Sequence, residues 1–175
     1  MKKLLLLLAV LIACFTLSAS ISPSYDAFFR ATIVRDSQLA VGGGVSGGVD
    51  IGRTRLSLYF LGDYYQDALG GDGFAANREF SLEPGVSAEW QLCQVWKMKI
   101  WAGLDIGCFM QFANVWQDPD AGTVFGTKGI MARAKLTAEF AFVKYWGMSL
   151  GVYYQLPLAP DYDDYRGLGF LLSIV

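Results

Sequence analysis

The clearest fold signal in the chain is the stretch LAVGGGVSGGVDIGRTRLSLYFLGDY (residues 39–64). Apolar residues alternate there with polar or small ones, which is the period of a β-strand with two different faces. The apolar row occupies odd positions before Gly52-Arg53 and even positions after it. Antiparallel partners keep the sum of their numbers constant, so a two-residue turn exchanges odd and even positions. Residues 39–64 are therefore predicted to form a β-hairpin with Asp50 opposite Arg55.

The same alternation continues on both sides of this hairpin, and no charged residue interrupts the apolar rows. The rows fall at 25–33, 39–51, 56–64, 80–92, 98–112, 130–142, 148–158 and 168–174. Three-residue connections at 35–37, 94–96 and 144–146 keep the odd–even order across them, and longer ones lie at 68–77, 117–127 and 159–164. Eight strands joined in sequence order predict an all-β, antiparallel up-and-down barrel.

The opposite face of these strands carries many glycines and almost all the charges. We expect a charge network there, in which Glu89 and Lys99 also meet as diagonal neighbours. Its predicted members are Asp26, Arg30, Asp50, Arg55, Asp63, Glu79, Glu83, Glu89, Lys97, Lys99, Asp105, Arg133, Lys135 and Glu139.

Side-chain volume indicates which face lies inside the barrel. The interior of an eight-stranded barrel is only just wide enough for side chains to fill it. The face with the glycines and serines therefore belongs inside, and the face crowded with Leu, Ile, Phe and Met belongs outside, where it needs lipid. A soluble ligand-binding barrel, apolar inside, is the alternative arrangement.

Composition favours the membrane arrangement. The chain is 54% hydrophobic and only 17% charged, whereas soluble domains have about 25% charged residues. The formal net charge is −2 and becomes more negative without Lys2 and Lys3, so no nucleic-acid partner is expected.

The first twenty residues have the pattern of an export signal. Lys2 and Lys3 precede an apolar run at 4–12 and small residues at 16–20. The run is too short for a transmembrane helix. We expect residues 1–20 to be removed as a signal peptide by cleavage near Ala19 or Ser20, leaving a barrel at 21–175. Alternatively, LIAC (11–14) acts as a lipobox and Cys14 becomes lipidated.

The sequence offers no catalytic or cofactor chemistry. It contains no histidine, the usual general base of hydrolases and acyltransferases. Cys93 and Cys108 have no metal-ligand spacing. We expect no enzyme activity, no cofactor and no metal.

Acidic and tyrosine residues gather in two of the long connections. They could hold a divalent cation or meet a basic partner, but a solvated loop is the simpler explanation. These residues are Asp118, Asp120, Asp161, Tyr162, Asp163 and Asp164.

The two cysteines beyond the signal are predicted to remain unpaired. With a connection at 94–96, Cys93 lies on the polar face opposite Lys97, and Cys108 lies on the apolar face opposite Leu82. The strand between Cys108 and Lys97 spans about 36 Å, far beyond the roughly 7 Å that a disulfide allows between Cα atoms.

In this pattern residues 25–175 resemble the small eight-stranded outer-membrane proteins of the OmpA, OmpX and OmpW type. The tail is similar to their insertion signal at Tyr165, Gly167, Phe170 and Leu172, with Val175 in place of the usual final aromatic residue. The resemblance implies a bacterial outer-membrane location, contact with outer-membrane lipid and with the barrel-insertion machinery, and a monomer.

Three functions remain open from the sequence. The first is a non-enzymatic outer-membrane barrel with a structural or surface-interaction role, whose interior is plugged by the charge network and whose surface partner is unknown. The second is a narrow channel for small or apolar solutes. The third is a lipidated or soluble ligand-binding barrel.

Overall fold

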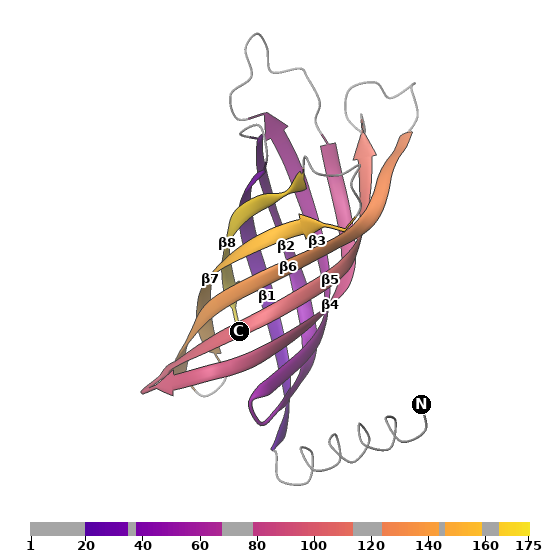
Figure 1. The fold of residues 1–175 in the computed structure, drawn as a ribbon. Helices are drawn as coiled ribbons and strands as arrows, with labels where there is room; N and C mark the ends of the chain where they lie inside the picture. The colour runs from indigo at the N-terminus through magenta and orange to yellow at the C-terminus, as the bar shows by residue number, and fades with distance from the viewer. Residues whose placement is uncertain (1–19, 35–37, 68–78, 114–123, 144–145, 159–164) are drawn as a thin grey trace, which may run out of the picture.

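The computed structural model describes residues 20–34, 38–67, 79–113, 124–143, 146–158 and 165–175. They form one closed barrel of antiparallel strands in which each strand pairs with its sequence neighbours and β1 also pairs with β8 (Figure 1). The strands are β1 (Ile21–Val34), β2 (Gln38–Ile51), β3 (Thr54–Asp67), β4 (Glu79–Val95), β5 (Met98–Ala113), β6 (Val124–Val143), β7 (Trp146–Pro157) and β8 (Gly167–Ile174). The predicted up-and-down barrel is confirmed.

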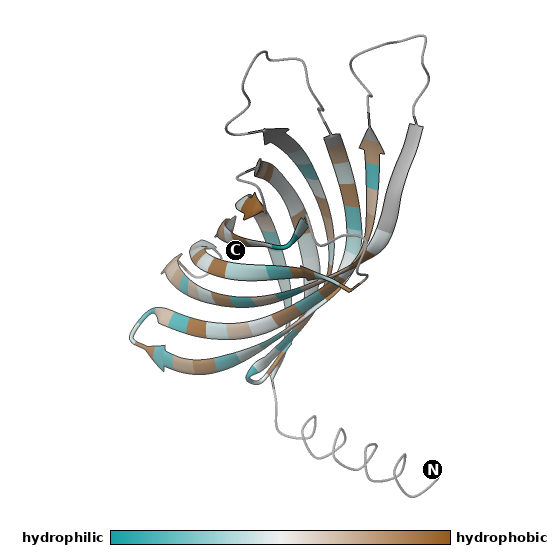
Figure 2. Cartoon of the chain, turned by 45° about the horizontal axis from the view of Figure 1, so that its top comes forward, coloured by the Kyte–Doolittle hydropathy of each residue, from teal (hydrophilic) through white to brown (hydrophobic). Residues whose placement is uncertain are grey.

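The predicted faces are also confirmed. Along β7 and β8 buried and exposed residues alternate at every second position, and Figure 2 shows hydrophobic and hydrophilic bands alternating along the strands. Asp50 pairs with Arg55 across the β2–β3 turn, as the sequence predicted. The pairing of Ile33 with Leu39 likewise agrees with a three-residue connection at 35–37.

Two predicted three-residue turns are wrong. Val95 pairs with Met98, so only Trp96 and Lys97 connect β4 to β5, and the register shifts between Gln91 and Cys93. Only residues 144–145 connect β6 to β7, and the register shifts between Ala141 and Val143. A β-bulge adds one residue to one strand. A bulge followed by a two-residue turn therefore preserves the odd–even order just as a three-residue turn does.

The bulge in β4 moves Cys93 from its predicted place. Cys93 pairs with Ile100 and is exposed, so it lies on the outer face rather than the polar one. Cys108 lies on the outer face as predicted. Its predicted partner on β4, Leu82, pairs with Met110 instead, and on β6 Cys108 pairs with Ile130. Eight residues of strand, about 26 Å, still separate Ile100 from Cys108. Both cysteines are free, as expected.

Two strands also extend beyond their predicted ends. β1 begins at Ile21 rather than at residue 25, and β6 begins at Val124, inside the connection predicted at 117–127. We call the end of the barrel with the connections 52–53, 96–97 and 144–145 the short-turn end, and the opposite end the long-connection end.

Large side chains fill the interior because glycines face them. Trp101 is 2% exposed and Tyr59 8% exposed. A Cβ atom on Gly85 would lie 2.3 Å from the Tyr59 ring, and one on Gly107 would lie 2.4 Å from its hydroxyl oxygen. The small residues of the inner face therefore make room for the tyrosine, which supports the assignment of faces by volume.

The outer face is apolar on every strand. Exposed examples include Phe29, Val45, Leu58, Val86 and Leu104. In the residues that the structure describes, no helix has the length and apolar character needed to cross a bilayer.

We predict that Gly48→Ala destabilises the barrel and that Gly47→Ala does not. A Cβ on Gly48 would meet the Leu56 carbonyl oxygen at 2.1 Å and the Ser57 Cα at 2.6 Å, whereas one on outward-facing Gly47 would meet only the Tyr25 ring, at 3.6 Å. Overpacking against backbone costs about 1–3 kcal/mol. Urea unfolding in detergent micelles, followed by tryptophan fluorescence, measures the difference. Equal stability of the two variants would contradict the packing.

Candidate functional site

The lumen of the barrel holds ion pairs at several levels along its axis. Nearest the long-connection end, Arg30 of β1 binds Asp63 of β3 with two hydrogen bonds, one of them 2.8 Å from Nε to Oδ1. The Arg30 guanidinium also lies 5.6 Å from the centre of the Tyr153 ring, and the Tyr153 hydroxyl bonds Thr32. Both charged side chains are almost fully buried.

The middle level is built around Arg133 of β6. Its guanidinium forms a two-pronged ion pair with Glu83 of β4. The Tyr59 hydroxyl donates to Glu83 over 2.5 Å, and Arg133 donates to Gln155 over 3.4 Å. These contacts connect β3, β4, β6 and β7 through the lumen. Two-pronged Arg–carboxylate pairs fix geometry as well as charge.

Towards the short-turn end the network continues through Lys135. Its ammonium nitrogen lies 2.6 Å from Glu89 and 2.9 Å from Asp105. The same nitrogen donates to the Ser87 hydroxyl over 2.9 Å. One lysine thus pairs with carboxylates from two neighbouring strands.

Arg55 forms the level closest to the short turns. It donates to both oxygens of Asp50, over 2.7 and 3.1 Å, and lies 3.0 Å from Glu139 and 3.6 Å from Glu89. Its guanidinium stacks 4.5 Å from the centre of the Trp101 ring. The predicted pair of Asp50 with Arg55 is confirmed.

Lys99 has a different partner from the predicted one. Its nitrogen lies 3.5 Å from Glu139, while Glu89 binds Lys135 and Arg55. The cause is the bulge in β4, which changes the register on which the pairing of Glu89 with Lys99 depended.

Two predicted members stand apart from the ion pairs of the described residues. Lys97 is exposed in the β4–β5 turn. Its nitrogen lies 5.5 Å from the centre of the Trp96 ring and not in the lumen. Asp26 accepts a hydrogen bond from Ser46 over 3.1 Å, but its Oδ1 is buried without a hydrogen-bond partner.

Other predicted residues lie beyond the structural description. The side chain of Glu79 is not among the described ones. The proposed contact residues of the long connections lie outside the described residues; they are Asp118, Asp120, Asp161, Tyr162, Asp163 and Asp164.

Sequence reasoning treated the interior aromatic residues as bulk and overlooked Gln155. The Gln155 amide donates to the Tyr165 carbonyl oxygen over 2.6 Å, and the Tyr165 hydroxyl donates to Gln111 over 2.5 Å. Gln155 and Gln111 both occupy inward positions in the strand alternation, which was the available signal. Without the barrel geometry their partners could not be assigned.

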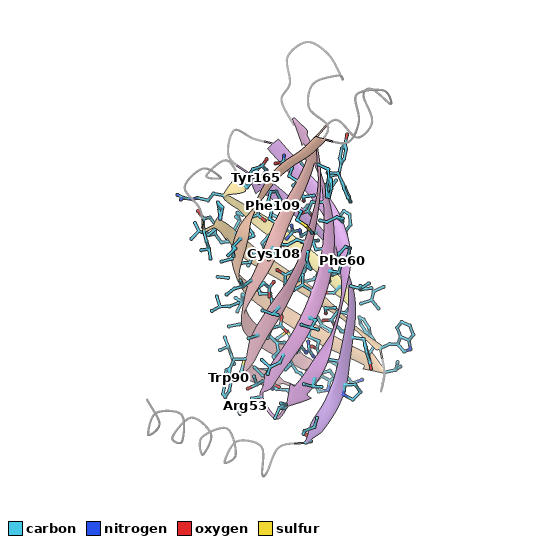
Figure 3. The ribbon with its side chains drawn as sticks, turned by 90° about the vertical axis from the view of Figure 1, so that its right-hand side faces the viewer. Arg53, Phe60, Trp90, Cys108, Phe109 and Tyr165 are labelled. Carbon is cyan, nitrogen blue, oxygen red and sulfur yellow. The ribbon has the colours of Figure 1, made fainter. Side chains whose placement is uncertain are left out.

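An apolar cluster fills the lumen at the long-connection end. It consists of Val34, Ala40, Phe109 and Met131, with Tyr165 packed against it. The rings of Phe109 and Tyr165 have centres 5.0 Å apart, and Figure 3 shows them together near this end. This cluster caps the polar levels below it.

The open space in the lumen is unequal along the axis. A cavity of about 50 Å³ lies among the polar levels, where Arg30, Glu89 and Lys135 line it. At the short-turn end an open hollow of about 1070 Å³ is lined partly by lumen residues such as Asp26 and Lys99 and partly by outward-facing residues such as Tyr25 and Phe60. Solvent therefore has far more room at that end than in the middle.

The glutamates of the lumen lie close to cations. Glu83, Glu89 and Glu139 each lie within 4 Å of an arginine or lysine nitrogen. Among the described residues no group of His, Cys, Asp and Glu is placed to hold a metal ion.

We predict that Arg133→Met lowers the free energy of unfolding by about 3–5 kcal/mol, because it leaves the Glu83 carboxylate buried without its cation. The double variant Glu83→Leu/Arg133→Met is expected to regain most of this loss. Arg53→Met, in an exposed turn, is the control and should change stability by less than about 0.5 kcal/mol. Urea titration in detergent micelles measures all three. If the double variant is as unstable as Arg133→Met, the pair does not act as a unit.

Solved structures with this architecture are known. Neisserial surface protein A (NspA) matches over 90% of this chain and 96% of its own, with a TM-score of 0.66 and 13% sequence identity. The N-terminal β-barrel domain of Pseudomonas aeruginosa OprF matches over 90% of this chain and 97% of its own, with a TM-score of 0.58 and 11% identity. No protein-family model and no curated protein sequence matches the chain. The likeness is therefore one of fold: the chain is a closed eight-stranded antiparallel barrel, as in these two structures.

Proposed function

We propose that this protein is an integral outer-membrane β-barrel with a structural or surface-interaction role and no enzymatic activity. The observation that supports this most directly is the distribution of residues between the two faces. Apolar side chains are exposed around the outside, whereas arginines, lysines and carboxylates are paired inside. A soluble ligand-binding barrel has the reverse arrangement.

Lipid is the medium that fits the outer face. Burying apolar surface is favourable by about 25 cal/mol per Å², and monomeric soluble proteins rarely expose continuous apolar areas of more than a few hundred Å². Here the exposed apolar residues occur on all eight strands. Closure of the barrel also pairs the strand backbones with one another, which a membrane interior requires.

Export and orientation form part of the same proposal. Residues 1–20 would be removed as a signal peptide, and the insertion machinery would place the monomer with its short turns in the periplasm, as in other outer-membrane barrels. The acidic long connections would then face the exterior. A basic surface partner would meet them there.

The lumen contacts argue for a plug rather than an open pore. The two-pronged pair of Arg133 and Glu83 connects β6 with β4 across the inner face of β5, and the apolar cluster around Phe109 fills the end beyond it. The hollow at the short-turn end favours the channel alternative in one respect, because lumen residues such as Asp26, Lys99 and Glu139 line part of it.

We expect the protein to fractionate with the outer membrane and to migrate differently on gels before and after boiling. A closed hydrogen-bonded barrel stays compact in detergent until heat opens it, so the two forms differ in mobility. Mature protein that remains soluble without detergent would exclude the membrane assignment.

We also expect no steady conductance in the nanosiemens range when the purified barrel is inserted into planar bilayers. Eight strands enclose little volume, and Trp101, Tyr59 and Arg133 occupy it. The double variant Glu83→Leu/Arg133→Met serves as a matched control, since it keeps the lumen filled and should remain closed. A stable open level in the unmodified protein would instead support the narrow channel.

A further inference from the structure

Exposed apolar residues lie at the strand ends beside the β4–β5 and β6–β7 connections. Trp96 is 85% exposed and Trp146 66%, and Val95, Phe142 and Val143 are exposed beside them. Tryptophan favours the level of the lipid headgroups. If the barrel spans the outer membrane as proposed, these two tips lie at the headgroups of the periplasmic leaflet. Figure 3 shows Trp90 at this same end of the barrel.

The β4–β5 tip also carries an unpaired positive charge. Lys97 is exposed and sits 5.5 Å from the centre of the Trp96 ring. No carboxylate partner for it occurs among the described residues, and residues 90–104 contain no acid. In contrast, the lumen-facing Lys99 and Lys135 both have carboxylate partners. The charge of Lys97 is therefore available to an anion at the headgroup level.

A groove runs over the outer face just above this tip. Its volume is about 420 Å³. The outward-facing residues that line it are Ile100, Leu136, Ala138, Leu150, Val152 and Phe170. Ala138 pairs with Ile100 on one side and with Leu150 on the other, so a small side chain lies between two larger ones.

The groove and the charge are separated by a distance that suits a phospholipid. Three residues of strand, about 10 Å, lie between Lys97 and Ile100. The headgroup region of each leaflet is about 5–7 Å thick, the difference between the whole bilayer and its hydrocarbon core. A lipid whose phosphate contacts Lys97 would therefore extend an acyl chain into the groove beside Ala138.

We propose that the β4–β5 tip and this groove form a binding site for one anionic phospholipid of the periplasmic leaflet. The headgroup phosphate pairs with Lys97 beside Trp96, and one acyl chain of the same lipid fills the groove. The inference rests on the proposed membrane insertion and adds a preferred lipid to it. The chemistry favours an anionic over a zwitterionic headgroup, because Lys97 has no acidic neighbour to pair with a headgroup amine.

The test uses the full mature barrel in nanodiscs of phosphatidylcholine. Each preparation contains a small share of a lipid with a photoreactive acyl chain, either phosphatidylglycerol or phosphatidylcholine, and mass spectrometry locates the cross-links. We expect labelling around Ala138 and Leu150 to be about fivefold higher with the phosphatidylglycerol probe, since one lysine near a membrane surface contributes about that preference.

Two variants with matched controls separate charge from groove. Lys97→Gln should reduce phosphatidylglycerol labelling to the phosphatidylcholine level, whereas Arg53→Gln, at the β2–β3 turn, should leave it unchanged. Ala138→Phe should remove the labelling by filling the groove, whereas Ala134→Phe, on the same face but outside the groove lining, should not.

The outcomes that contradict this site differ from those that contradict membrane insertion. Equal labelling by both probes, or undiminished labelling in Lys97→Gln, would overturn the lipid site in a barrel that is correctly inserted. A protein that fails to enter nanodiscs and shows no heat-dependent gel mobility would overturn the proposed function itself.

Discussion

Closure of the eight-stranded ladder limits what the rest of this structure can contain. A barrel of this size has an interior just wide enough for side chains, and every inward position competes for that volume. Gly85 and Gly107 leave space in which Tyr59 lies, and Tyr59 in turn reaches Glu83. The inner face is consequently a mixture of glycines, long polar side chains and a few apolar residues such as Leu61 and Met131, and most of the large aliphatic residues occupy the outside.

Buried charges in a filled polar interior need partners. A buried charge without its partner costs several kcal/mol, although a buried pair contributes little compared with a well-packed apolar replacement. The levels around Arg30, Arg133, Lys135 and Arg55 meet this requirement with carboxylates from other strands. Such a network connects strands beyond the backbone ladder, because Arg30 and Arg133 each bind a carboxylate two strands away. It is therefore well suited to a rigid, closed scaffold that presents connections at its ends.

The outside of the barrel follows the opposite rule, and its details differ from one hairpin to another. The exposed apolar surface reaches the tip of β4–β5 and of β6–β7, where Trp96 and Trp146 are located. The β2–β3 turn instead carries Arg53 without tryptophan in the turn itself. At the short-turn end, the β4–β5 and β6–β7 hairpins therefore differ from the β2–β3 hairpin in their exposed tryptophans. The proposed lipid site lies on the side of the tryptophans.

The amino-acid sequence was sufficient for the strands, their faces and the nearest-neighbour pair of Asp50 with Arg55, because alternation and turn length are local properties. The sequence could not predict the bulges, because a two-residue turn combined with a bulge gives the same odd–even order as a three-residue turn without one. Cys93 and Lys97 were misplaced for that reason. The pairs Arg30–Asp63 and Glu83–Arg133 also required the closed barrel. Their residues are 33 and 50 positions apart and lie on strands with one other strand between them. Only the inward curvature of the closed sheet brings these side chains within reach of each other.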